Sequence, residues 1–495
     1  MIARAKPGAV RLQDVVEQID RAGLLIARPA ADAMIAGVTD DSRRVVQGDL
    51  FCAWEGANVD AHAFVPDVAE QGAAAALVEH ETPAALPQVV VADGRRAASV
   101  GASVVLGWPQ DGLRMAGVTG TNGKTTTVWI LRHLLGLRHA AASIGTLGVI
   151  LEDGRPLEGS ESLTTPGPVE MIRILHGLVD RGVGAVAMEV SSHALEQGRV
   201  HALGFDAAVF TNLTHDHLDY HGTEAAYLAA KLSLIDRIRD NGWAVINAAD
   251  AAWRDVPLRA ARVLSFGLGA GADLHAASLV LDEHGAHFDC NFRGRTVAVD
   301  LPLPGGFNVE NALGAMGACL ALGFDLEELA LRLRDVPQVP GRLERITDRP
   351  CAVFRDYAHT PDALERVLLT LRPLTRGRLI VLFGAGGDRD RRKRPVMGRV
   401  VDAHADVAIV TSDNPRTEDP EKIIDEISAA MVRPHVRITD RRAAIAHALE
   451  VALPDDVILL AGKGHETYQV LGTGRVPFDE RVIVAQMLAT KGLRP

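Results

Sequence analysis

Apolar, β-rich runs that stop abruptly at glycine or polar residues recur along the 495-residue chain, and a helix-like stretch follows each run. The segments are LRMAGVTGTNGK, GAVAMEVSSH, DAAVFTNLTHDH, RLIVLFGAGGDRD, ADVAIVTSDNPR and DVILLAGKGHE. Uninterrupted apolar strands that alternate with helices predict an α/β fold whose mainly parallel sheets are covered on both faces. Ligands of such sheets bind beyond the carboxyl ends of the strands, so we expect the chemistry in these polar motifs.

Two breaks rich in glycine and proline divide the chain, one at 107–109 and the other at 336–341. They predict three domains. The first is a smaller α/β domain over residues 1–109, the second a nucleotide-binding domain over 110–338, and the third a doubly wound, Rossmann-like domain over 339–495.

Charge and cysteine content exclude several classes of protein. A formal net charge of -11 argues against a nucleic-acid partner, which would need a basic face. The four cysteines are far apart, without the spacing of a zinc ribbon or a disulfide framework, and this pattern favours a reducing compartment. The N-terminus MIARAKPGAVRLQDVVEQID does not resemble a secretory signal, and the apolar runs are too short to span a membrane. We therefore expect a cytoplasmic protein without a membrane partner.

A phosphate-binding loop is the most specific motif. It joins a strand to a helix that begins near Thr125, and it comprises Gly120, Thr121, Asn122, Gly123, Lys124, Thr125 and Thr126. Glycines let backbone N–H groups surround a phosphate, the lysine reaches the β and γ phosphates, and Thr125 can hold magnesium. The strict P-loop pattern requires glycine where this chain has Val118. The alternative is a plain glycine turn before a helix, but the strand, lysine and threonine favour a nucleoside triphosphate site.

The form GTNGKTT resembles the Mur ligase superfamily, which also includes folylpolyglutamate synthetases. Related motifs extend from Ser42 to Glu466, nearly the whole chain. The resemblance implies an amide ligase that uses ATP and Mg²⁺, and we expect it to be a monomer. Its implied substrates are UDP-N-acetylmuramoyl-L-alanyl-D-glutamate and meso-2,6-diaminopimelate, joined through an acyl phosphate.

Glu189 and His217 end what we expect to be neighbouring strands, so a carboxylate and an imidazole can converge on a cation. The resemblance assigns both residues to magnesium. His215, His217, Asp219 and His221 alternate in a way that suggests zinc, but the absence of cysteine and the nearby phosphate loop favour magnesium.

Lys231 lies on a helix pattern, where a lysine is by default a solvated surface residue. In the Mur ligases that this chain resembles, a lysine fourteen positions after the metal histidine is carbamylated, and 217 to 231 has that spacing. The resemblance therefore implies that a carbamylated Lys231 supports the magnesium ion. Together with Lys124, Glu189 and His217, it completes the expected catalytic set.

The resemblance also implies the substrate contacts. Ser42 is expected to bind the UDP moiety, while Ala57 stands where many relatives carry a polar residue. The ATP contacts Asn308 and Arg342 come from motifs on either side of the second break, and a two-domain ATP site requires closure before chemistry. The expected contacts of the muramoyl peptide are Thr164, Thr165, Ser191, Gln197 and Arg199.

The last three strand motifs are expected to bind the incoming amino acid. The residues concerned are Arg389, Asp413, Asn414, Pro415, Arg416, Gly462 and Glu466. In the relatives that add diaminopimelate, DNPR marks the selection of that amino acid, and lysine-adding relatives differ there. The alternatives are a lysine-adding ligase, a folylpolyglutamate synthetase, a P-loop motor or kinase, and a silent nucleotide-binding regulator. A silent regulator would have lost Lys124, Glu189, His217 or Lys231, and all four remain.

Overall fold

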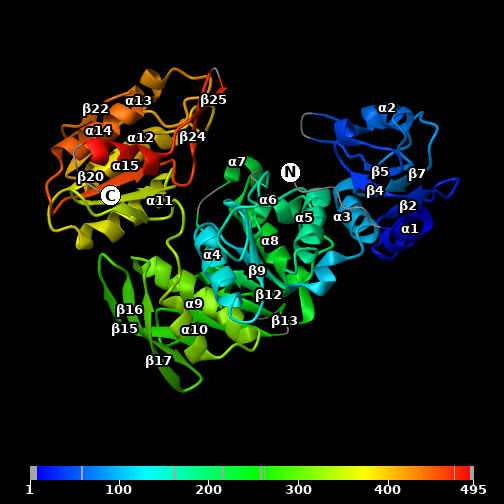
Figure 1. Ribbon diagram of the computed structural model, residues 1–495, viewed down its shortest axis with the longest axis horizontal. Coiled ribbons are helices and arrows are strands. Elements are labelled where there is room, and N and C mark those ends of the chain that lie inside the picture. Colours follow the sequence, from blue (N-terminus) through cyan, green and yellow to red (C-terminus); the bar gives the residue numbers. More distant parts are fainter. Residues whose placement is uncertain are drawn as a thin grey trace. The chain divides into compact units, whose positions relative to one another are not determined.

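The computed structural model describes residues 8–56, 59–160, 163–214, 217–256, 259–260, 262–472 and 474–490. Internal contacts group the chain into two compact units. Figure 1 labels many of their helices and strands. The first unit comprises residues 1–277, 289–297 and 310–332, and the second comprises 278–288, 298–309 and 333–495. In the described part of the chain, no helix is both long and apolar enough to cross a membrane.

The N-terminal part of the first unit contains a five-stranded sheet in the order β2-β7-β6-β5-β4. Its strands are β2 (Leu25–Ala27), β4 (Gly37–Thr39), β5 (Asp49–Cys52), β6 (Ala75–Val78) and β7 (Gln88–Val91), preceded by the small ladder of β1 (Val10–Arg11) with β3 (Met34–Ile35). Side chains alternate between the faces, because Leu50 packs with α1 (Leu12–Arg21) and α3 (Gly94–Val105), while Phe51 packs with α2 (Val65–Glu70).

A ten-stranded sheet follows, in the order β10-β9-β11-β8-β12-β13-β14-β15-β16-β17. The neighbours from β9 to β15 in this order pair in parallel. The strands are β8 (Arg114–Thr119), β9 (Ala141–Gly145), β10 (Gly148–Ile150), β11 (Ala185–Glu189), β12 (Phe205–Phe210), β13 (Ile238–Asn247), β14 (Val263–Gly267), β15 (Leu274–Leu281), β16 (Ala286–Phe292) and β17 (Arg295–Leu301). The helices are α4 (Lys124–Leu135), α5 (Pro168–Val179), α6 (Ser192–Glu196), α7 (Leu218–His221), α8 (Glu224–Leu232), α9 (Gly306–Ala321) and α10 (Leu326–Leu333).

Helix α9 lies unusually close to the sheet because it carries glycine at the contact. A Cβ atom added at Gly317 would lie 2.9 Å from a methyl carbon of Val245 on β13, and one at Gly314 would lie 3.1 Å from the ring of Phe266 on β14. This close approach places Asn311, on the same helix, beside the loop that follows β8.

The second unit contains a six-stranded sheet in the order β18-β19-β23-β20-β21-β22, in which only β18 is antiparallel. Alternate residues of β20 face two cores, because Val381 packs with α11, α12 and α13, while Leu382 packs with α14 and α15. The strands are β18 (Glu344–Thr347), β19 (Ala352–Asp356), β20 (Leu379–Phe383), β21 (Val407–Val410), β22 (Val436–Arg437) and β23 (Val457–Ala461), and β24 (Tyr468–Leu471) and β25 (Gly474–Pro477) form a hairpin. The helices are α11 (Pro361–Leu371), α12 (Lys393–His404), α13 (Pro420–Ser428), α14 (Arg441–Val451) and α15 (Glu480–Thr490) (Figure 1).

The predicted α/β class, with parallel sheets and a doubly wound C-terminal sheet, is confirmed. The two breaks seen in the sequence lie between α3 and β8 and between α10 and β18. The exact domain boundaries at 109 and 338 stay a prediction.

Candidate active site

The loop after β8 has a shape that only glycine permits at two positions. Gly120 and Gly123 adopt φ angles of +150° and +85°. An added Cβ at Gly120 would lie 1.9 Å from Oγ1 of Thr211, and one at Gly123 would lie 2.3 Å from Oδ1 of Asn311. The loop therefore folds tightly against the segment that follows β12 and against α9.

Hydrogen bonds from the segment after β12 fix this loop. The backbone N–H of Thr121 donates to the carbonyl of Asn212 (2.7 Å), and that of Asn122 donates to Oδ1 of Asn212 (2.9 Å). Oγ1 of Thr211 donates to the carbonyl of Asn122 (2.7 Å). The loop shape is thus held by hydrogen bonds within the protein itself, which lowers the ordering cost of binding a phosphate. The sequence motif did not identify Thr211 and Asn212.

Lys124 begins α4 and folds back over the loop that precedes it. Its Nζ donates to the carbonyl oxygens of Gly120 (2.8 Å) and Thr121 (2.9 Å). Thr125 and Thr126 follow in the buried first turn of the helix. A helix N-terminus preceded by a glycine loop favours an anion, since its N–H groups and the helix dipole point toward it.

Lys231 is buried, contrary to the default expectation for a lysine on a helix. Its side chain on α8 is only 1% exposed, and its Nζ donates to the carbonyl of Gly120 at 2.7 Å. Nζ also lies 4.4 Å from the ring centroid of Tyr227. Because Gly120 accepts from both lysines, two ammonium groups meet at the phosphate loop.

Glu189 ends β11 with its side chain buried, and Oε1 accepts a hydrogen bond from the backbone N–H of Thr146 (2.8 Å). The expectation that Glu189 and His217 follow adjacent strands is wrong. β8, the strand that leads into the phosphate loop, lies between β11 and β12 and pairs in parallel with both. Glu189 and the segment leading to His217 therefore flank the phosphate loop on opposite sides.

His217 adopts a left-handed backbone conformation (φ 52°) and belongs to a group of rings. Its ring centroid lies 4.8 Å from that of His193 and 6.2 Å from that of Tyr227. His221 lies 5.4 Å from His193 and its Nε2 is 3.0 Å from Oγ of Ser192. His215 lies outside the described residues. Neither His193 nor Tyr227 was among the predicted site residues.

The predicted contacts of the muramoyl peptide form a network beside Glu189. Oγ1 of Thr165 donates to the carbonyl of Glu189 (2.9 Å), and it accepts from the backbone N–H of Ser191 (3.1 Å). Arg199 donates to the carbonyl of Thr165 (2.9 Å) and to Oε1 of Gln197 (2.6 Å). Oγ1 of Thr164 lies 3.2 Å from Oγ1 of Thr146, which also contacts Glu189.

Ser42 begins a short 3-10 helix (Ser42–Arg44) between β4 and β5 of the N-terminal sheet. The carboxylate of Asp41 caps this helix by accepting a hydrogen bond from the backbone N–H of Arg43 (3.1 Å). Ala57 lies outside the described residues.

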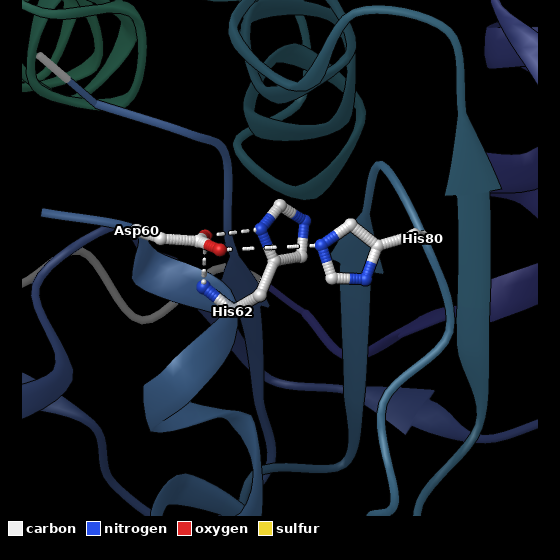
Figure 2. A group of neighbouring side chains, drawn as sticks. All are labelled: Asp60, His62 and His80. Atoms are coloured by element: carbon white, nitrogen blue, oxygen red, sulfur yellow. Dashed lines mark hydrogen bonds and ion pairs between the residues drawn. The ribbon is translucent and has the colours of Figure 1, made fainter.

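Asp60, His62 and His80 form the group of possible metal ligands shown in Figure 2, and their ligand atoms lie within 4.8 Å of one another. Nδ1 of His62 lies 2.5 Å from Oδ1 of Asp60, whereas Nε2 accepts from the backbone N–H of Glu79 (2.8 Å). The proton of a neutral His62 must therefore reside on Nδ1, where it blocks metal binding. The ring of His80 stacks on that of His62 at 4.1 Å. We interpret the group as structural.

The second unit gathers its motifs at one edge of the sheet. The parallel strands β19, β23, β20 and β21 are consecutive in the sheet, and their carboxyl ends carry DYAH, GKGHE, GAGGDR and SDNPR. A Cβ atom at Gly462 would lie 2.3 Å from Oδ2 of Asp413, and one at Gly387 would lie 1.9 Å from the carbonyl of Pro415. The loops after β20, β21 and β23 are therefore in contact.

A buried lysine connects two of these loops. Nζ of Lys463, which is 0% exposed, donates to Oδ1 of Asn414 (3.0 Å) and to Oε2 of Glu466 (2.9 Å). Oδ1 of Asn414 also accepts from the N–H of Val470 (2.9 Å), so its Nδ2 donates to Glu466 (2.8 Å). Lys463 belongs to the GKGHE motif but was not among the predicted site residues. Its position between two glycines at a strand end does not distinguish it from a surface lysine.

Arg389 and Arg416 follow the ends of β20 and β21, which are adjacent strands in the sheet. Arg416 has φ 52°, and its Nη1 donates to the carbonyl of Gly387 at 2.8 Å. Arg389 is exposed, and its Nη1 donates to the carbonyl of Asp388 at 3.3 Å. Arg416 thus belongs to the loop after β21 and contacts the loop after β20, whereas Arg389 is exposed to solvent.

Asn308 and Arg342, the expected ATP contacts, both belong to the second unit. Nδ2 of Asn308 donates to the carbonyl of Pro304 (2.8 Å), and the guanidinium of Arg342 lies 4.6 Å from the ring centroid of Tyr357. Burial, aided by Arg342, lowers the pKa of His465 to about 3, and burial also lowers the pKa of His359. Both imidazoles are therefore neutral at physiological pH.

A cavity of about 640 Å³ lies elsewhere in the second unit, between Glu283, Pro302, Gln338, Arg345 and Phe354. None of the predicted site residues lines it. It is mixed in charge, since Arg345 is paired with Asp348. The converging strand ends therefore define the candidate site better than cavity size does.

Comparison with known proteins shows that the chain belongs to the Mur ligase family. Three family models match, described as Mur ligase family, catalytic domain (34–107), Mur ligase middle domain (118–319) and Mur ligase, glutamate ligase domain (341–464). The resemblance indicated by GTNGKTT is confirmed.

Individual relatives narrow the comparison. The chain is 42% identical over 469 residues to the UDP-N-acetylmuramoyl-L-alanyl-D-glutamate--2,6-diaminopimelate ligase of Geobacillus kaustophilus, covering 92% of this chain and 96% of the relative. It is also 42% identical over 496 residues to the enzyme of that name from Gloeobacter violaceus, covering 98% and 99%. A solved structure of a ligase with this name is 35% identical, covers 93% of this chain and 96% of its own, and superposes with a TM-score of 0.69.

Proposed function

We propose that this protein is an ATP-dependent ligase that joins meso-2,6-diaminopimelate to UDP-N-acetylmuramoyl-L-alanyl-D-glutamate in the synthesis of peptidoglycan precursors. The observation that carries the proposal is the buried network of Asn414, Lys463 and Glu466 beside Arg416. It provides charged, oriented groups of the kind that the two charged ends of diaminopimelate require. Relatives with the same named activity, which align over nearly the whole chain, support it.

The reaction proceeds in two steps. The γ-carboxylate of the D-glutamyl residue attacks the γ-phosphorus of ATP, and the bond to the bridging oxygen breaks to release ADP. The amine of diaminopimelate then attacks the acyl phosphate, a tetrahedral intermediate forms, and phosphate leaves as the amide forms. Lys124 offsets the charge on the transferred phosphoryl group. Arg199 and Thr165, which are hydrogen-bonded to each other, position the peptide beside the phosphate loop.

The donors around the loop suit a magnesium ion, since Glu189 and Thr125 offer oxygen and His217 offers nitrogen beside the expected phosphates. When bound, magnesium would neutralise phosphate charge. Lys231 fits the role of a carbamylated support, because it is buried next to the loop rather than in solvent. Carbamylation would replace a buried cation by an anion suited to the metal.

ATP is expected to contact the phosphate loop over 120–126, Asn308 and Arg342. Three domains with boundaries near 109 and 338, a monomeric state and a cytoplasmic location complete the proposal. The cysteines support a reducing compartment, because all four are buried and free.

The decisive experiment is an ADP-release assay with the UDP-muramoyl dipeptide, comparing meso-diaminopimelate, L-lysine and no amino acid. We expect ADP release that depends on diaminopimelate, with the tripeptide seen by mass spectrometry. Equal rates with lysine would instead identify a lysine-adding ligase. ADP release without any amino acid would contradict the ligase mechanism.

Arg416→Ala tests the choice of amino acid. The hydrogen bonds of Arg416 to Gly387 and Asn414 use Nη1, and a guanidinium also carries donors on Nε and Nη2. These can hold the distal carboxylate of diaminopimelate, while Glu466 pairs with the distal ammonium. Lysine lacks that carboxylate and leaves the guanidinium unpaired, at a cost of roughly 3 to 5 kcal/mol, or about two to four powers of ten in selectivity.

We therefore expect Arg416→Ala to raise the KM for diaminopimelate about a hundredfold or more, with little change in the KM for ATP, and to narrow the preference over lysine. Steady-state ADP release measures the KM for diaminopimelate, the KM for ATP and the preference for diaminopimelate over lysine. Arg437→Ala is the matched control, because Arg437 is a surface arginine of the same unit paired with Asp425. A variant at position 416 that keeps the full preference for diaminopimelate would show that another residue selects the substrate.

A further inference from the structure

Two charged side chains are fully buried behind the amino-acid motifs. Arg441 begins α14 and Glu480 begins α15, and both side chains are 0% exposed. Nη2 and Nε of Arg441 lie 2.7 and 2.8 Å from Oε1 of Glu480. Removing two charges from water costs free energy that their mutual attraction barely offsets. A protein with an apolar pair of similar volume in their place is often at least as stable. Global stability alone therefore does not explain this pair.

The remaining contacts of Arg441 are with the ends of two strands. Nη2 donates to the carbonyl of Ala461 at 2.8 Å, and Nη1 donates to the carbonyl of Ser412 at 3.5 Å. Ala461 is the last residue of β23, and Ser412 follows the end of β21. β20 lies between these strands in the sheet, so a single guanidinium bridges two strand ends that do not pair with each other.

The residues that follow these two carbonyls are Asp413 and Gly462, where the proposed amino-acid motifs begin. The motifs are in contact there, because a Cβ atom on Gly462 would lie 2.3 Å from Oδ2 of Asp413. Beyond that contact, Lys463 connects Asn414 with Glu466. The relative position of the two loops is thus set by buried cations at both ends.

We propose that Arg441, held in place by Glu480, is a positioning residue for the amino-acid pocket: it fixes the spacing between the loop over 413–416 and the loop over 462–466. This inference rests on the proposed function of those loops. Arg441 contacts backbone carbonyls beneath the pocket and acts through Asn414 and Glu466. Its loss moves the pocket groups relative to one another, and displacements of about 1 Å cost rate and affinity without removing any contacting group.

The same sheet offers a matched control at its opposite edge. Arg378 precedes β20 and Asp456 precedes β23, and Nη2 of Arg378 lies 2.7 Å from Oδ2 of Asp456. Nη2 also donates to the carbonyl of Val451 (2.7 Å). This pair resembles Arg441 and Glu480 in joining an arginine to a carboxylate and a carbonyl, but it lies at the amino ends of the strands.

The test compares Arg441→Lys and Glu480→Gln with Arg378→Lys. Lysine keeps the charge but cannot reach Ser412, Ala461 and Glu480 together. We expect Arg441→Lys to raise the KM for diaminopimelate about tenfold or more and to leave the KM for ATP within about twofold, because only the amino-acid loops are displaced. Glu480→Gln should act in the same direction more weakly, and Arg378→Lys should change neither constant.

Urea unfolding of each variant separates stability from positioning. A stability loss with unchanged KM values, or an equal rise in the KM for ATP and diaminopimelate, would overturn the proposal. If Arg441→Lys does not fold, the KM split in Glu480→Gln decides in its place. The wild-type enzyme is assayed first, so that a failure of the proposed function appears as ADP release that does not depend on diaminopimelate.

Discussion

Replacing Lys124 by alanine is expected to lower the rate of ligation by at least about 10² to 10³-fold while the fold stays intact. The ammonium group lies on the phosphate loop, where its partners are the carbonyls of Gly120 and Thr121. When ATP binds, it exchanges these carbonyls for phosphate oxygens, whose charge grows as the phosphoryl group is transferred. Alanine provides no charge and is a good helix former at the start of α4.

ADP release by the purified variant measures the effect, and circular dichroism during heating checks the fold. Lys422→Ala is the matched control, since Lys422 is an exposed lysine on α13. Near-normal ligation by a folded Lys124→Ala variant would contradict the assignment of the phosphate loop.

Lys231→Ala is expected to be nearly inactive and to recover in part when a short carboxylate such as formate is added. The side chain is buried with Nζ 2.7 Å from the carbonyl of Gly120, so its removal leaves a space beside the phosphate loop that a small anion can enter. If carbamylated Lys231 supports the magnesium ion, the added carboxylate restores the missing negative charge. A positive charge alone should not suffice, so Lys231→Arg should remain inactive.

Activity is measured as ADP release with and without formate, and the wild-type enzyme with formate is the control for general salt effects. Full activity of Lys231→Ala, or full activity of Lys231→Arg, would contradict a carbamate. In either case, the buried lysine would serve only to hold the carbonyl of Gly120 and the loop around it.

The sequence alone predicts the parallel sheets and the edge where the motifs gather, because uninterrupted apolar strands that end in glycine or polar residues are compatible with few other folds. It could not place β8 between β11 and β12, since strand order depends on crossover connections rather than on the residues within a strand. For this reason Glu189 and His217 were expected on adjacent strands, and the structure corrects that expectation.

Like the strand order, the burial of charged residues could not be predicted from the sequence. Lys231 and Lys463 are both fully buried, yet helical periodicity and a glycine-flanked position do not distinguish them from surface lysines. The resemblance to known ligases singled out Lys231, and only the structure singles out Lys463 and Arg441. Roles that depend on contacts between distant segments, such as that of Thr211 with Asn122, become visible only in three dimensions.

The shared acceptor at Gly120 brings two lysine ammonium groups together at the phosphate loop. Lys124 and Lys231 donate to the same oxygen through bonds of 2.8 and 2.7 Å, so their positive charges are held close together and repel each other. An anion that arrives between them, or the conversion of one of them to an anion, removes that repulsion. The affinity for the triphosphate therefore includes the relief of that repulsion as well as the new contacts. Salt screens both the repulsion between the lysines and their attraction for the triphosphate. Raising the ionic strength should therefore weaken nucleotide binding more steeply than it would at a site with a single lysine.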